Sequence, residues 1–209
     1  MAVIQSYSEV SDPAALRKAA LGAALAMGAY LLLMATSFSP WMITALASGI
    51  GTAAFFSLIA ANVSVAATRW IAAYMVLMRL LTLVSMVGVS LLRQGVFTPQ
   101  LLVSMVESIM WIAFLVTWLI GQAGPIRRSA AVVVVGVAVW LAVYAPVLIH
   151  DLKTTGKPDA QLRATLLVLN AIITIFFLWI LAKGPPVSAS YPLSGPAPPP
   201  LPGGASGGA

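Results

Sequence analysis

The chain lacks the side chains on which most catalytic and metal sites are built. Cysteine is absent from its 209 residues, which excludes disulfides, thiolate chemistry and Cys-based metal or cluster sites. The only histidine is His150, whereas membrane haem-b proteins and metalloproteases use two or more. No G-x-S-x-G, H-E-x-x-H or phosphate-binding glycine loop occurs. We therefore expect no enzyme, no metal site and no cofactor, although a bound lipid or pigment stays open.

Charge is also scarce. Charged residues make up 8% of the chain and hydrophobic residues 61%, against about 25% and 45–50% in ordinary soluble domains. Eleven Lys and Arg against five Asp and Glu give a net charge of +6. The basic residues mostly stand singly or in pairs at the ends of apolar runs, without the basic stripe of a nucleic-acid-binding surface. This composition predicts a membrane protein with no nucleic-acid partner.

Long apolar runs are what the chain does contain. Crossing ~30 Å of hydrocarbon takes a helix of about 20 residues, and six runs reach that length: approximately 19–38, 41–61, 70–92, 99–121, 129–149 and 162–182. A backbone in lipid must satisfy its own hydrogen bonds, so such segments are expected to be helices. The sequence predicts an all-α, polytopic integral membrane protein, with an N-terminal interfacial segment at 1–18 and a six-helix transmembrane domain at 19–183.

Helix start and stop signals support several boundaries. A capping side chain precedes a proline at three starts, where the missing N–H costs nothing: Asp12-Pro13, Ser39-Pro40 and Thr98-Pro99. Asp159 is a candidate cap for the sixth span. Stops are marked by Gly95, Gly121 and Gly184-Pro185-Pro186. The second boundary is the least defined, because 62–69 is only mildly polar and the helix could continue to about residue 66.

The last segment, residues 184–209, is composed mainly of Pro, Gly, Ser and Ala. Such a composition cannot build a core, so it predicts a disordered or extended Pro/Gly-rich tail. One interpretation is a flexible end. The other is that the APPPLP segment docks on a partner, with Tyr191, the tail's one aromatic residue, as a candidate contact.

The distribution of basic residues predicts the orientation. An even number of spans puts both termini on one side, which then holds Arg17, Lys18, Arg69, Arg127, Arg128 and Lys183. The opposite side holds Arg93, Lys153, Lys157 and Arg163. The bias favours both termini in the cytoplasm, and we expect a multi-pass protein of a bacterial-type inner membrane.

Arg79 lies at the centre of the third span, where an arginine costs ~2.5–3.5 kcal/mol on insertion scales. Steps of three or four residues from it give a mixed polar stripe, which would face the bundle interior or another protein: Thr82, Met86, Ser90 and Arg93. The fourth span carries the only acid inside a span, Glu107, on a stripe with Ser104, Trp111, Trp118 and Gln122. These two residues are the leading site candidates.

Helix arithmetic complicates a pair between them. Folding about residues 93–98 puts Arg79 level with about residue 112, so Glu107 lies ~7–8 Å further towards the loop. The Cα–Cβ bonds of antiparallel helices also diverge. Three interpretations stay open for Arg79: a direct or water-bridged pair with Glu107, snorkelling towards Trp70, or a partner outside the chain.

Other polar and small residues predict helix packing. Asn170 and Thr174 share a face of the sixth span with Arg163 and Phe177, and are expected to make interhelical hydrogen bonds, as is Ser90. Small residues spaced four apart, in Ala45-xxx-Gly49 and Ala47-xxx-Gly51, permit close helix approach.

Two functions are consistent with these features. The first is a non-catalytic subunit of a larger membrane protein complex, including a bioenergetic one, with other membrane subunits and lipids as partners. The alternative is a small transporter or channel that uses Arg79 and Glu107 in the membrane interior. The halves of the chain show no internal repeat and no paired interrupted helices, so the sequence favours the subunit.

Overall fold

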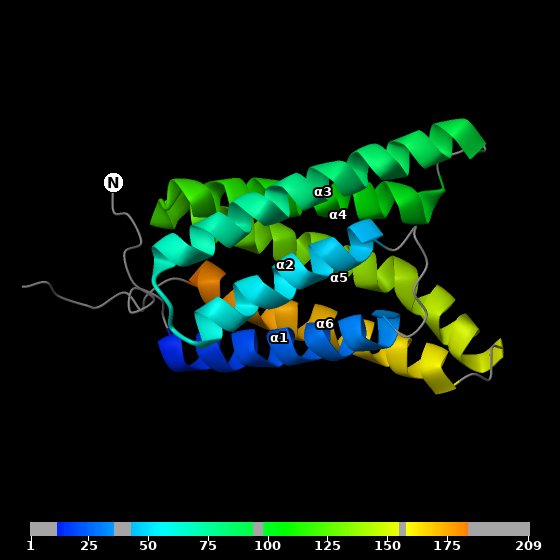
Figure 1. Ribbon diagram of the computed structural model, residues 1–209, viewed down its shortest axis with the longest axis horizontal. Helices are drawn as coiled ribbons and strands as arrows, with labels where there is room; N and C mark the ends of the chain where they lie inside the picture. The colour runs from blue at the N-terminus through cyan, green and yellow to red at the C-terminus, as the bar shows by residue number, and fades with distance from the viewer. Residues whose placement is uncertain (1–11, 36–42, 94–97, 155–157, 184–209) are drawn as a thin grey trace, which may run out of the picture.

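The computed structural model describes residues 12–35, 43–93, 98–154 and 158–183, apart from the side chains of 44–45, 89–93, 151–154 and 158–160. Within these ranges the chain forms helices and turns and no β-strand. The helices are α1 (Pro13–Ala35), α2 (Ile43–Ala60), α3 (Val65–Arg93), α4 (Pro99–Ile120), α5 (Ala123–Thr154) and α6 (Pro158–Lys183). Figure 1 shows them running roughly along the long axis of the molecule.

Capping residues set several of these boundaries as predicted. Asp12 Oδ1 accepts a hydrogen bond from the Ala15 N–H at 2.8 Å. The Thr98 side chain accepts one from the Leu101 N–H at 3.3 Å, with Pro99 in the first turn of α4. Gly121 ends α4 in the left-handed conformation, with φ of 77°, where a residue with a Cβ is disfavoured. Local chemistry therefore fixes both ends of α4.

Other boundaries differ from the prediction. The extension of α2 to residue 66 is wrong: α2 ends at Ala60, and Asn62 with a φ of 56° turns the chain. Asp159 is not a cap, because α6 already begins at Pro158. His150 belongs to α5, which runs on to Thr154. Ser39-Pro40, Gly95 and Gly184-Pro185-Pro186, like the tail with Tyr191, lie outside the described residues.

The helices form a closed ring whose order follows the chain. Each helix packs against its sequence neighbours, and α6 packs against α1. Glycines allow the close approaches that the sequence indicated: a Cβ on Gly51 of α2 would lie 2.7 Å from the Tyr74 ring of α3. Hydrogen bonds also connect neighbouring helices. The Tyr74 hydroxyl of α3 donates to the Ala47 carbonyl of α2 at 3.0 Å, and the Thr117 hydroxyl of α4 meets the Ser129 hydroxyl of α5 at 2.7 Å. Spans three and four are thus adjacent, a relation that the sequence left open.

One half of the ring is filled by an aromatic core. Edge-to-face contacts connect Phe55 to Trp118 at 5.4 Å and Phe56 to Phe177 at 5.0 Å between ring centroids. The Trp118 indole N–H donates to the Thr68 hydroxyl at 3.2 Å. These residues lie in the halves of their helices nearest the start of α1 and the end of α6. That end of the ring, which we call the closed end, is therefore packed shut.

The outer surface of the ring is apolar. Large hydrophobic side chains are exposed on every helix, among them Leu32, Ile50, Val84, Ile109, Val135 and Trp179. In water such a surface would be unstable, whereas in a bilayer it faces lipid. Five helices are long and apolar enough to cross a membrane: α1, α4 and the main parts of α3, α5 and α6. The chain is a multi-pass helical membrane protein.

The second of the six predicted spans is the one that differs. The described part of α2 has 18 residues, or ~27 Å at 1.5 Å per residue, and its apolar segment is Leu46–Ala60. The described part of α2 is therefore shorter than each of the other five apolar helices. The predicted segment 1–18 also differs in part, because α1 already begins at Pro13.

Candidate functional site

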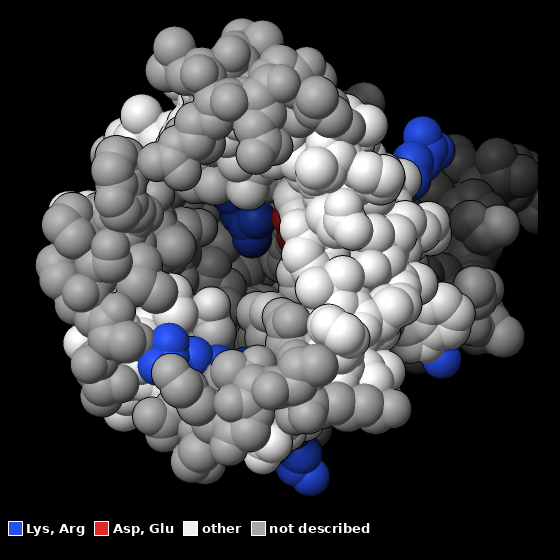
Figure 2. Space-filling model, turned by 90° about the vertical axis from the view of Figure 1, so that its right-hand side faces the viewer, with Lys and Arg blue, Asp and Glu red and all other residues white. Residues whose placement is uncertain are grey.

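A cavity of about 310 Å³ lies in the other half of the ring, and all six helices contribute to its wall. Its polar lining residues are Thr52, Arg79, Thr82, Ser104, Glu107, Ser108, Asn170 and Thr174. Its apolar and aromatic ones are Met27, Met86, Trp111, Val137, Trp140, Tyr144, Leu167 and Ala171. Seen from the end at which α1, α3 and α5 finish, the molecule is hollowed at its centre, with basic and acidic atoms inside (Figure 2). The site is thus a chamber with its mouth opposite the closed end.

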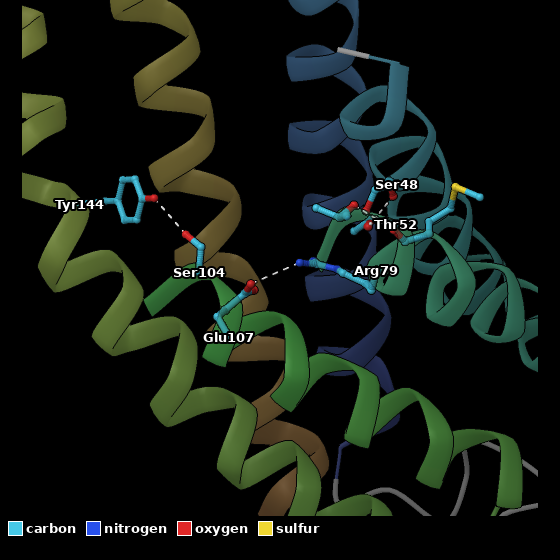
Figure 3. Close-up of polar contacts among 8 residues, drawn as sticks. Ser48, Thr52, Arg79, Ser104, Glu107 and Tyr144 are labelled. Carbon is cyan, nitrogen blue, oxygen red and sulfur yellow. Dashed lines mark hydrogen bonds and ion pairs between the residues drawn. The ribbon is translucent and has the colours of Figure 1, made fainter. Parts of the chain in front are cut away.

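Arg79 and Glu107 meet in the wall of this chamber. Arg79 Nη1 donates to Glu107 Oε2 at 3.2 Å, from α3 to α4 (Figure 3). Their side chains are 19% and 15% exposed, so the attraction between the charges is only partly screened by water. The contact is through one nitrogen and one oxygen, which leaves other N–H groups and the second carboxylate oxygen outside it.

The surroundings of Arg79 explain how it reaches Glu107. The guanidinium carbon lies 5.6 Å from the centre of the Trp111 ring, a cation–π contact that stabilises the charge. Trp111 is therefore near the level of Arg79, as the helix arithmetic placed residue 112. Glu107 lies about one turn further towards the mouth, and the length of the arginine side chain spans the offset.

Two polar atoms of lining residues have no partner. Arg79 Nε and Asn170 Oδ1 are buried and make no hydrogen bond within the structure. Arg79 comes from α3 and Asn170 from α6, which are not sequence neighbours. An unsatisfied buried polar atom costs about 1–3 kcal/mol. Neighbouring atoms close both off from water, as they do the Nε atoms of Arg69 and Arg163 outside the chamber.

Hydroxyl groups add further acceptors. Thr52 donates to the Ser48 carbonyl at 2.9 Å (Figure 3) and Thr82 to the Met78 carbonyl at 2.8 Å. Each hydroxyl has only one hydrogen, so both oxygens keep free lone pairs. Ser104 and Tyr144 bond to each other at 2.9 Å, which joins α4 to α5 near the mouth (Figure 3).

The sequence-predicted residues divide into two groups. Arg79, Glu107, Asn170 and Thr174 all line the chamber. Ser90 belongs to α3, but its side chain, like that of Arg93, lies outside the described residues, as does Tyr191. The aromatic lining residues Trp140 and Tyr144, whose rings stack at 4.7 Å, were not predicted. Their spacing of four residues on one helix face was the available signal.

Among the residues that the structure describes, no three His, Cys, Asp or Glu side chains are grouped so that they could hold a metal ion.

Comparison of the chain with protein-family models, curated proteins and solved structures finds no match. The class that the fold defines is a helical multi-pass membrane protein.

Proposed function

We propose that the chain is a small membrane carrier that binds a solute in the chamber at the centre of its helix ring. The observation that supports this function is the chamber itself, which has a wall drawn from all six helices and a charged pair inside. Ligand sites in membrane carriers lie between helices near the middle of the bilayer, and ionisable residues there commonly mark a solute pathway. This is the alternative of the two functions considered from the sequence.

Transport through the closed end requires a conformational change. A solute that enters at the mouth meets the packed contacts of Phe55, Phe56, Trp118 and Phe177. Passage to the other side therefore requires these aromatic side chains to part, as in alternating access. With both termini in the cytoplasm, as the basic residues favour, the mouth lies on the outer side of a bacterial-type inner membrane.

The subunit function makes a different use of the same residues. There the polar pair serves helix assembly, and the chain is held by other membrane subunits. In that case Arg79→Leu loosens a complex of fixed stoichiometry without affecting any solute flux. The chamber favours the carrier because Arg79 finds its partner inside the chain rather than on an outer face.

The experiment is uptake into liposomes that contain the purified full chain alone. Labelled alanine, lactate, choline and glycerol represent a zwitterion, an anion, a cation and a neutral solute. We expect uptake of at least one above empty liposomes. Thr82→Trp should abolish it by filling the chamber, whereas Val84→Trp, on the exposed side of the same helix, should not. Absence of any uptake, together with recovery of the chain from its native membrane only in a fixed complex, would support the subunit instead.

A further inference from the structure

The chamber also indicates a class of ligand, an inference that rests on the proposed function. We propose that it binds a compact zwitterion with one carboxylate and one ammonium group, as in a small free amino acid. The carboxylate lies against Arg79, and the ammonium lies against Glu107 and Asn170.

The charge of the wall is the first argument. Arg79 and Glu107 are the charged residues among the described side chains that line the chamber, and their charges cancel. A lone anion or cation would leave a net charge in the membrane interior, which costs several kcal/mol unless it is compensated. A zwitterion adds no net charge, and each of its ends finds an opposite charge.

The unfilled hydrogen bonds are the second argument. Arg79 has Nη N–H groups beyond the one bonded to Glu107. Those donors suit a carboxylate, which accepts from a guanidinium. Glu107 has a second carboxylate oxygen outside its contact with Arg79, the Asn170 amide lines the chamber, and the Thr52 and Thr82 oxygens keep lone pairs. An ammonium group, which carries three donors and no acceptor, matches this set.

The size of the chamber is the third argument. A volume of about 310 Å³ corresponds to roughly ten waters at ~30 Å³ each, near the lower end of the range for small-molecule sites. Besides its polar residues, the wall has apolar and aromatic side chains, among them Met27, Met86, Val137 and Trp140. The chamber therefore has room for a compact amino acid with an apolar side chain.

A matched set of four probes tests the class. Alanine is the zwitterion; lactate replaces its ammonium by hydroxyl, alaninamide replaces its carboxylate by amide, and lactamide carries neither charge. Binding to the full chain in lipid nanodiscs is measured by calorimetry at neutral pH or slightly below. We expect alanine to bind at least tenfold more tightly than each of the other three. Equal affinity for alanine and lactamide, stronger binding of either single ion, or no binding of alanine would overturn the proposal.

Two variants should change which of the four probes binds most tightly. Glu107→Gln leaves the wall with a positive charge, so lactate should become the preferred ligand. Arg79→Gln leaves it negative, so alaninamide should become preferred. Arg128→Gln, which removes the same charge from an exposed position, should leave the preference for alanine unchanged. Retention of that preference in both chamber variants would contradict the assignment of the two ends, and the comparison of probes on the unaltered chain stands alone if a variant does not fold.

One further probe distinguishes a free amino acid from a phospholipid headgroup, since both carry an anion and an ammonium group. Ethanolamine phospholipids also carry an anion and an ammonium a few bonds apart. Glycerophosphoethanolamine, the headgroup without its acyl chains, should bind less tightly than alanine, and tighter binding would overturn the choice of an amino acid. Uptake of lactate, choline or glycerol in the liposome experiment without a preference for alanine would refute this inference while leaving the carrier function in place.

Discussion

Removing either partner of the Arg79–Glu107 pair should destabilise the protein. Leucine at position 107 leaves the guanidinium in the membrane interior with only Trp111 beside it. A guanidinium cannot lose its proton, so we expect a loss of about 2.5–3.5 kcal/mol, the cost of an unpaired arginine at a helix centre. Leucine at position 79 leaves the Glu107 carboxylate without its cationic partner, so Arg79→Leu should also destabilise the protein.

The double variant Arg79→Leu/Glu107→Leu gives the decisive comparison. With both partners apolar, no charge stays unpaired, and the free energy of unfolding should lie closer to that of the unaltered protein than in Glu107→Leu. Unfolding of all four proteins in a denaturing-detergent titration, followed by tryptophan fluorescence and circular dichroism, yields the coupling energy. We expect about 2 kcal/mol. A coupling energy near zero, with the two single losses simply adding, would refute the view that the 3.2 Å contact compensates these charges.

Two further predictions concern the packing of the ring. Gly51→Ala places a methyl group 2.7 Å from the Tyr74 ring and should destabilise the protein by about 1–2 kcal/mol. Gly28→Ala, with no atom within 4 Å of the new methyl group, should stabilise it slightly because alanine is the better helix former. Equal shifts of the unfolding temperature for the two variants would contradict the close packing of α2 on α3. Trp118→Ala should lower the free energy of unfolding by about 3–5 kcal/mol, since Trp118 is 2% exposed and hydrogen-bonded to Thr68. Trp179→Ala, at a 51% exposed position, should lower it much less. Similar losses for the two variants would show that the closed end is not tightly packed.

The fold could be predicted from the sequence to the extent that local signals specify it. Apolar length identified each helix, and capping chemistry at Asp12, Thr98 and Gly121 placed boundaries correctly. The end of α2 was predicted at about residue 61 and lies at Ala60. A continuation to about residue 66 stayed open because 62–69 is only mildly polar, and the positive φ of Asn62 is a backbone property that asparagine tolerates but does not dictate. The ring order was inaccessible, because apolar helices carry lipid-facing and core-facing surfaces of similar composition.

Several residues that line the chamber could be singled out from the sequence, but the chamber itself could not. Helical spacing gathered Arg79, Thr82 and Met86 on one face and Ser104, Glu107 and Trp111 on another, and these faces line the chamber. Asn170 and Thr174 were interpreted as helix-packing residues, since an unpartnered oxygen cannot be recognised without a structure. A direct pair was one of three interpretations that the sequence left open for Arg79. Trp111 lies beside the guanidinium as the helix rise predicts, and the length of the arginine side chain spans the offset to Glu107.

The central claim is that the ring encloses a chamber open to water at one end, and the absence of native cysteine allows a direct measurement. A single cysteine at position 82 or 84 in sealed liposomes is exposed to a charged, membrane-impermeant methanethiosulfonate reagent. We predict that Thr82→Cys, in the chamber wall, reacts at least tenfold faster than Val84→Cys, which faces lipid on the same helix, and that alanine slows only the former. Equally slow reaction at both positions would contradict the chamber and the function built on it.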